Sequence, residues 1–450
     1  MPIITFAHFV YLFFVLAILV CIAIKKDPMV ITLVGLLVVG IMNTHSLVKG
    51  LQGVFNAIYT SAIGMFVIPL LIAVVIAFSK VLRETGADYI MVAPVKKLLG
   101  RPAISFWVLG FTIFALALVF WPMPAAGLVG TILVPIAISA GMTPLAAAVP
   151  LAMFGHGGAT GGDWFLQGAP TVLANTSGLP ISEILATSKP IVGVSLLVGS
   201  VVAWVMLKRS GAFNGEKSEA AAHSIEATKM APFTAVMVLA ALAIDIYIMV
   251  TQRLVGGDAT YLLGGTILML TALICLYEFK EKSLDKFIGV YKEGFVTAIE
   301  IFGPVFIISA FFMIGSAEGA GSVYGEGTPG YLVEIGQSIA HSGAVNIPLL
   351  AVVQTLVAAL CGMDGAGFDQ LPLLGSMAKA LAPAIGANAV PLACLGQMVT
   401  IWTAGALVPW GFLAALAGFC GVSPIELARK NFIPTLCAFT AGTIVTIFMM

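Results

Sequence analysis

Charged residues are scarce in this chain of 450 residues, since Asp, Glu, Lys and Arg together make up only 9%. A soluble domain carries about 25% charged residues, so the composition excludes a water-soluble globular enzyme. The 21 basic and 21 acidic residues cancel, and no nucleic-acid partner is indicated. The chain has instead a hydrophobic content of 60% and a mean hydropathy of +1.09. Its long apolar runs, separated by short polar gaps, predict an all-α, multi-pass membrane protein.

Several chemistry-bearing motifs are also missing. The six cysteines form no CxxC pair and lie in or beside apolar runs, so we interpret them as packing residues. No Walker A sequence indicates ATP as an energy source, and no HExxH motif indicates a membrane hydrolase. No Arg-rich helix indicates a voltage sensor, and no repeated filter motif indicates a channel. We therefore predict that the protein is not an enzyme and holds no cofactor, with Na⁺ as a candidate coupling ion.

Apolar runs that can enter a bilayer are predicted near 7–24, 28–43, 54–79, 103–121, 188–207, 231–251, 260–277, 294–316, 345–361 and 431–449. Two further regions, 122–175 and 362–420, are apolar but rich in glycine and proline. We interpret each as a re-entrant hairpin followed by a broken helix. The short amphipathic segments 88–99 and 329–341 are predicted to be interfacial helices. The first run has no basic leader and no cleavage site, so it is predicted to be retained.

The two halves of the chain resemble each other. Three pairs of segments match in the same order at an offset of about 240 residues, namely 46–49 with 283–286, 148–152 with 389–393, and 178–183 with 421–426. Such collinear matches indicate an internal duplication. We assign 1–207 to the first repeat, 208–229 to a cytoplasmic linker and 230–450 to the second repeat.

The placement of basic residues gives a topology. Lys and Arg gather after the run 54–79, in the linker 208–229, and before the runs 294–316 and 431–449. The positive-inside rule places these clusters in the cytoplasm. The run 54–79 then points inward and its mate 294–316 points outward, so the repeats are inverted. Inverted repeats with broken helices are the architecture of secondary transporters, whose substrate binds near the midplane.

The first candidate site is the segment 154–164, in which five glycines occupy eight positions. Glycine permits a broken helix whose backbone polar groups face a cavity. We predict that Gly155, Gly157 and Thr160 bind the substrate. His156 is predicted to bind the substrate or carry a proton, and Asp163 is predicted to couple the ion. The alternatives are a satisfied buried histidine and a carboxylate that caps a helix.

The second candidate is the matching segment 394–405, which lies in a stretch without charge from 380 to 425. Gln397, Thr400 and Thr403 recur at a spacing of three and so share one helical face. We predict that they bind the substrate. The alternative is hydrogen bonding between helices.

The third candidate is a pair of re-entrant tips at 121–127 and 362–369. A half-helix that begins at such a tip points its N–H groups at the midplane, where they bind anions. Gly365 is predicted to contact the substrate, and Asp364 and Asp369 to couple the ion. The alternative is that both acids cap helix starts in a loop that reaches water.

Glu300 is a lone acid in the run 294–316, followed by Gly303 and Pro304. We predict a helix break there, matching one near Gly64 and Pro69, and a role for Glu300 in ion coupling. The alternative is that Glu300 extends to the interface and water. No Lys or Arg lies between 101 and 189 or between 379 and 429. An anion is therefore expected to be held without a salt bridge, which suits small carboxylates better than phosphates.

The run 117–158, ALVFWPMPAAGLVGTILVPIAISAGMTPLAAAVPLAMFGHGG, is similar in layout to a helix, hairpin, helix and His-Gly-containing break of the ion transporter superfamily. Within that superfamily the chain resembles the gluconate permease-like (gluconate:proton symporter) group, although it departs from that group in the stretch 158–170. The resemblance implies a homodimer, each subunit having a scaffold part and a mobile transport part.

We predict a secondary active transporter in the lipid of a bacterial cytoplasmic (inner) membrane. It is expected to carry out ion-coupled symport, with a proton favoured over sodium, of a small organic anion such as a sugar acid or a di- or tricarboxylate. The alternative is a sodium/proton antiporter of the same superfamily, with acids converging at the midplane. A non-transporting membrane subunit is disfavoured, because broken-helix backbone is costly without a function.

Overall fold

The computed structural model describes residues 4–23, 26, 28–215, 227–341, 345–365, 367–409 and 411–450. These residues form helices, and no strand occurs among them. By length and composition, seven of the described helices can cross a membrane, or eight if a bent pair counts as one span. The predicted all-α membrane fold is therefore confirmed. The boundaries of the linker stay a prediction, because its residues 216–226 lie outside the described part.

The first half contains α1 (Phe6–Ala23), α2 (Met29–Thr44), α3 (Leu47–Met65), α4 (Val67–Thr85), α5 (Ala87–Val92), the 3-10 helix η1 (Ala93–Leu98), α6 (Pro102–Phe120), α7 (Pro122–Ser139), α8 (Pro144–Pro150), the π-helix η2 (Leu151–Thr160), α9 (Gly168–Ser177) and α10 (Ile181–Arg209). Short helices thus form over the predicted interfacial segment 88–99.

The second half contains α11 (Ala231–Gln252), α12 (Gly257–Phe279), the 3-10 helix η3 (Lys280–Lys282), α13 (Ser283–Met313), α14 (Ala317–Tyr324), α15 (Tyr331–His341), α16 (Ile347–Cys361), the 3-10 helix η4 (Gly362–Asp364), α17 (Leu371–Leu381), the 3-10 helix η5 (Pro383–Ile385), α18 (Ala389–Ala406), α19 (Phe412–Cys420) and α20 (Pro424–Met449). The order of long, short and hairpin helices repeats that of the first half.

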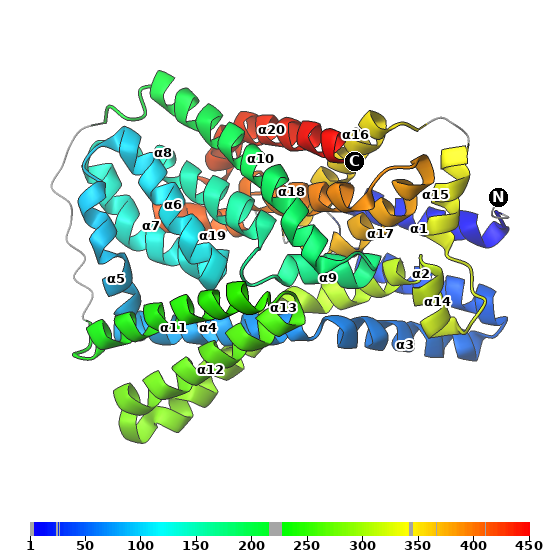
Figure 1. The fold of residues 1–450 in the computed structure, drawn as a ribbon, viewed down its shortest axis with the longest axis horizontal. Helices are drawn as coiled ribbons and strands as arrows, with labels where there is room; N and C mark the ends of the chain where they lie inside the picture. Colours follow the sequence, from blue (N-terminus) through cyan, green and yellow to red (C-terminus); the bar gives the residue numbers. More distant parts are fainter. Residues whose placement is uncertain are drawn as a thin grey trace.

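Hairpin helices of each half pack against helices of the other half. Helix α7 packs on α19 while α17 packs on α9, and α10 packs on its own counterpart α20. In Figure 1, α3 and α4 run from right to left, whereas α13 runs from left to right. The two halves are therefore inverted repeats that interlock, as the sequence predicts.

The matching helix breaks differ between the halves. Helices α3 and α4 meet at Phe66 with a bend of 55°, between Gly64 and Pro69. The break expected at Gly303 and Pro304 is absent, because α13 continues through both. A proline removes one hydrogen bond and bends a helix, but it need not end one whose turns on both sides are packed. Helix α13 has such packing, since it lies against α3 and α4.

The first hairpin, α6–α7, begins and ends beside the carboxyl end of α10. At its start, the indole Nε1 of Trp204 donates to the carbonyl of Ala103 (3.0 Å). At its end, the amide of Gly215 donates to the carbonyl of Gly141 (2.9 Å). The second hairpin, α16–α17, ends beside the carboxyl end of α20, where the amide of Asn388 donates to the carbonyl of Met450. The first hairpin therefore enters the molecule and returns to the side it came from.

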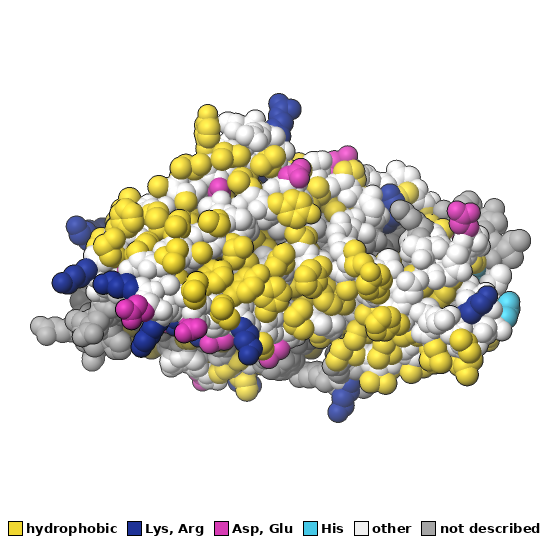
Figure 2. Space-filling view, turned by 90° about the horizontal axis from the view of Figure 1, so that it is seen from below, with side chains coloured by type: hydrophobic (Ala, Val, Ile, Leu, Met, Phe, Trp, Pro, Cys, Tyr) yellow, Lys and Arg dark blue, Asp and Glu magenta, His cyan; other side chains and the backbone are white. Residues whose placement is uncertain are grey.

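The outer surface is apolar. Figure 2 shows hydrophobic side chains over most of the face seen from below, with charged side chains mainly at its edges. On α11, for example, Val236, Tyr247 and Val250 are exposed. Helix α18, in contrast, is buried along its whole length. A buried central helix inside an apolar outer ring is the arrangement expected of a protein embedded in lipid.

Candidate functional site

The tips of the two hairpins meet in the interior. Trp121 is the single residue between α6 and α7, and Phe368 lies between η4 and α17. Their ring centroids are 5.2 Å apart. Trp121 has φ 65° and ψ 152°, an uncommon backbone conformation that costs about 1–3 kcal/mol. The sequence prediction of two re-entrant tips is confirmed, and the structure adds that they touch.

The glycine-rich segment after α8 is a π-helix, and every residue of it is buried. It packs closely on α18, and glycine is needed at both surfaces. A Cβ on Gly157 would lie 2.5 Å from the ring of Trp402, and a Cβ on Gly405 would overlap the imidazole of His156. The helix then breaks between Asp163 and Gln167, both of which have positive φ (43° and 60°).

His156 is held on two sides. Its Nδ1 lies 2.9 Å from the carbonyl oxygen of Ile401, and its ring centroid lies 4.8 Å from that of Phe412. Because a carbonyl only accepts, Nδ1 carries the hydrogen and Nε2 is an acceptor. The side chain is 5% exposed. His156 is therefore a buried histidine whose Nδ1 has a hydrogen-bond partner. Its role in substrate binding or proton transfer stays a prediction.

Asp163 is 3% exposed and caps α9. Its Oδ1 accepts from the amide of Gln167 (3.2 Å) and its Oδ2 from the amide of Ala169 (2.8 Å). Gln167, which the sequence analysis missed, accepts with its Oε1 from the amide of Gly256 (2.6 Å). It therefore ties the break to the turn before α12. A polar residue in an apolar stretch is the only sequence signal for Gln167.

Helix α18 carries the least satisfied polar groups of the site. Gln397 donates with its Nε2 to the carbonyl of Gly161 (3.0 Å), which joins the two repeats. Its Oε1, the hydroxyls of Thr400 and Thr403, and Oε1 of Gln370 at the start of α17 are buried, with no hydrogen-bond partner among the described residues. A buried polar group without a partner costs about 1–3 kcal/mol, so these oxygens are suited to a ligand, an ion or water.

The second hairpin tip lies against this face of α18. A Cβ on Gly362 would lie 2.6 Å from the Cβ of Thr403, and a Cβ on Gly367 would lie 3.2 Å from the carbonyl oxygen of Thr400. The carbonyl of Gly365 abuts Gly411, just before α19. The structure thus places Gly362 and Gly367, which flank Gly365, against Thr400 and Thr403, and the binding of a substrate by Gly365, Thr400 and Thr403 stays a prediction.

Other predicted residues lie apart from this cluster. Gly155 faces Ile113 of α6, where a Cβ would lie 2.9 Å away, and Thr160 donates to the carbonyl of Gly155 (3.2 Å). Glu300 is exposed on the surface of α13. Asp369 is buried beside the second tip. The side chain of Asp364 lies outside the described part of the structure, so its predicted role in ion coupling stays a prediction.

The chemistry of the cluster follows from its atoms. The amide oxygens of Gln370 and Gln397 only accept hydrogen bonds, so they suit a cation or a hydroxyl group. The hydroxyls of Thr400 and Thr403 both donate and accept, so they suit a carboxylate or a cation. Among the described residues, no group of three or more His, Cys, Asp or Glu gathers as transition-metal ligands do.

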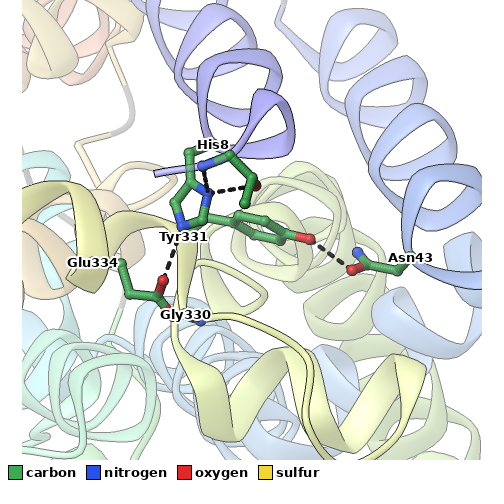
Figure 3. A network of polar contacts seen from close by, with 6 residues as sticks. His8, Asn43, Gly330, Tyr331 and Glu334 are labelled. Atoms are coloured by element: carbon green, nitrogen blue, oxygen red, sulfur yellow. Dashed lines mark hydrogen bonds and ion pairs between the residues drawn. The ribbon is translucent and has the colours of Figure 1, made fainter. Parts of the chain in front are cut away.

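A second polar network lies outside the hairpin site (Figure 3). The amide of Thr5 donates to Nδ1 of His8, so Nε2 of His8 carries the hydrogen, and it contacts Oε2 of Glu334 at 3.0 Å. The hydroxyl of Tyr331 donates to Oδ1 of Asn43 (2.6 Å). The network joins α1, α2 and α15, and we interpret it as a structural tie. No sequence spacing indicates it, because His8 and Glu334 are 326 positions apart.

Comparisons with known proteins find a family and a fold. No family model matches the chain. The membrane protein YhfA of Bacillus subtilis (strain 168), described as uncharacterized, is 33% identical over 460 residues, which cover 98% of each chain. The crystal structure of the YdaH transporter of Alcanivorax borkumensis, described as having an unusual topology, matches with a TM-score of 0.57 at 12% identity. That match covers 99% of this chain and 98% of the other. The matches support a membrane transporter fold but not the gluconate permease-like group.

Proposed function

The chain belongs to the same family as the Bacillus subtilis membrane protein YhfA, and from this premise we propose that it is a secondary active transporter for a small organic anion. The fold it shares with the YdaH transporter supports transport. The observation that carries the proposal is the contact between the two hairpin tips, beside buried oxygens of α18 that have no partner in the described structure. Such a site lies at the junction of inverted repeats, where transporters bind their substrates.

The choice of an organic anion rests on the donors around the tips. Helices α7 and α17 both begin at a tip, at Pro122 and Leu371, so their N-termini favour negative charge there. The unpartnered hydroxyls of Thr400 and Thr403 add two donors. A small carboxylate such as a sugar acid or a di- or tricarboxylate fits these donors, and the hydroxyls of a sugar acid fit the free amide oxygens.

The polar atoms that have no hydrogen-bond partner in the described structure indicate the coupling ion. The sequence favours a proton, because His156 and Asp163 lie near the break. In the structure both groups have partners, whereas Oε1 of Gln370 and Gln397 and the two threonine hydroxyls have none among the described residues. Oxygens of this kind coordinate hard cations. We therefore propose sodium as the coupling ion, with proton coupling as the competing outcome.

Three further features belong to the proposal. We place the protein in a bacterial cytoplasmic membrane, since the relative that shows its family is bacterial and the basic clusters follow the positive-inside rule. We propose that it is a homodimer, as the family resemblance implies. We propose that it is not an enzyme, because the described residues of the site combine hydrogen-bonding groups without pairing a nucleophile with a base.

The proposal is tested with purified protein in liposomes that contain a pH dye. A panel of carboxylates, including gluconate and citrate, is added outside with sodium or with potassium. Uptake that needs sodium and leaves the internal pH unchanged is expected. Acidification beyond that of protein-free liposomes would indicate proton symport instead. Alkalinisation on adding sodium alone would indicate the alternative, a sodium/proton antiporter, and would overturn the anion site.

A further inference from the structure

A cavity of about 380 Å³ lies between α4, α7 and α19. Its wall includes Ser79, Lys80, Arg83 and the acid Glu84 of α4, Met123 and Pro124 of α7, and Phe419 of α19. A volume of this size accommodates a small organic molecule. The cavity is bordered by a smaller one that shares Ser79, Arg83 and Pro124 with it and also touches Asp88.

The basic residues of this cavity differ in their partners. Lys80 forms an ion pair with Glu293 of α13, and Lys286 of α13 forms one with Glu84. Arg83 has no ion pair among the residues described. Its guanidinium lies on α7 instead, since a Cβ on Gly127 would be 2.7 Å from a guanidinium nitrogen and 3.5 Å from the ring of Phe419. Asp88 is the acid nearest in the adjoining cavity, and its Oδ1 accepts from the amide of Tyr89 (2.7 Å).

The residues that line the cavity are close in sequence to two places of interest. At one end it reaches Met123 and Pro124, which follow the tip residue Trp121 by two and three positions. At the other end lies the carboxyl end of α4, where the carbonyl of Thr85 accepts from the amide of Thr228 in the linker (3.0 Å). The positive-inside rule assigns this linker side to the cytoplasm. The hydroxyl of Ser79 is buried between these ends without a described partner.

From this placement we propose that the cavity is the cytoplasmic access route to the hairpin site and that Arg83 draws the carboxylate of an organic anion into it. The inference rests on the proposed function. It revises the expectation that the anion meets no basic side chain. That expectation considered the stretch between Arg101 and Lys189, and it missed Arg83 because α4 lies beside α7 only in space. A positive charge at the mouth raises the local concentration of anions.

The proposal is tested by thiol labelling of full-length protein in inside-out vesicles. Met123→Cys is introduced after the six native cysteines are replaced, and its reaction rates with an anionic (sulfonatoethyl) and a cationic (trimethylammonioethyl) methanethiosulfonate are compared. Arg83→Gln is expected to lower the ratio of the anionic to the cationic rate by at least about 5-fold, because one charge about 8 Å away changes the two rates in opposite directions, each by about 2.4-fold even at the dielectric of water. Arg83→Lys should keep the ratio, and Arg209→Gln, at the exposed end of α10, is the matched control.

Two results would overturn the proposal. One is a thiol at Met123 that is not labelled from the cytoplasmic side, and the other is a ratio that Arg83→Gln leaves unchanged. If Met123→Cys does not fold, Ser79→Cys reports on the same cavity. Gluconate or citrate is expected to slow the anionic reagent only when Arg83 is present. Labelling does not require transport, so a ratio that depends on Arg83 in a protein that transports no carboxylate would sink the proposed function and leave an anion-attracting cavity.

Discussion

At the scale of single residues, the hydroxyls of Thr400 and Thr403 are the main evidence for a binding site. Both are buried in α18, and neither hydroxyl has a hydrogen-bond partner in the described part of the chain. Their shared helical face is predictable from sequence, because a spacing of three is local information. The satisfied state of His156 and Asp163 is not predictable, since it depends on Ile401 and on the fold of the 163–169 turn. The types of residue in the site are thus predictable from sequence, whereas the atoms left without a hydrogen-bond partner are not.

Thr400→Val separates a binding role from a structural one. Valine has the shape of threonine and removes a hydroxyl that no described residue bonds. We expect uptake to fall at least tenfold while the thermal midpoint of the purified protein is unchanged or higher. The matched control is Thr446→Val in α20, whose hydroxyl donates to the carbonyl of Gly442 (2.8 Å). It should cost about 1 kcal/mol of stability and keep uptake. Wild-type uptake by Thr400→Val would contradict the assignment.

Asp88 gives the protein a predictable dependence on pH. Burial raises its pKa from 3.8 to about 6, although the Tyr89 amide and the nearby Arg83 oppose the rise. An acid whose pKa is raised in the folded state contributes full stability below 3.8 and loses it as the pH rises through 6. Asp88→Asn should therefore stabilise the protein by up to about 3 kcal/mol at pH 7 and have little effect near pH 4.

This change is measured as the thermal midpoint in detergent between pH 4 and pH 8. Asp258→Asn, at the exposed start of α12, is the control and should leave the pH dependence as it is. A destabilised Asp88→Asn protein at pH 7 would show that the ionised carboxylate is needed for folding, against this account.

At the scale of elements, the helices and hairpins follow from hydropathy and length, which are local properties. The breaks are less predictable. The sequence indicates equal breaks at Gly64–Pro69 and Gly303–Pro304, yet only the first pair of helices is bent, because packing on α3 and α4 keeps α13 continuous. The contact between His8 and Glu334 is likewise not predictable from sequence, since only the fold brings α1 and α15 together.

Gly405→Ala tests the close packing of the π-helix on α18. The new Cβ would overlap the ring of His156, and both helices are buried along their whole length. Overpacking of this kind costs about 1–3 kcal/mol, so the thermal midpoint should fall and uptake with it. Gly418→Ala in α19 is the control. It meets no atom within 4 Å and should be neutral or stabilising by up to about 1 kcal/mol. Equal midpoints for the two variants would contradict the packing described.

At the scale of the whole molecule, the inverted repeat explains why the site forms at all. Each half supplies one hairpin tip, and the two tips meet in the interior. The duplication is readable from three collinear matches, and the inversion from basic residues, so sequence predicts the architecture well. The identity of the substrate is not readable, because it depends on a few side chains at the meeting of the tips and on backbone groups whose directions are set by the fold.

Ion-coupled transport of a carboxylate is measured as accumulation driven by an ion gradient. Tight proteoliposomes receive labelled gluconate, citrate and other carboxylates, either with an inward sodium gradient at equal internal and external pH or with an inward proton gradient without sodium. We predict that a sodium gradient concentrates at least one carboxylate inside, that a sodium ionophore abolishes this, and that Thr400→Val does not support it. If folded wild-type protein accumulates no carboxylate under either gradient, the account is wrong.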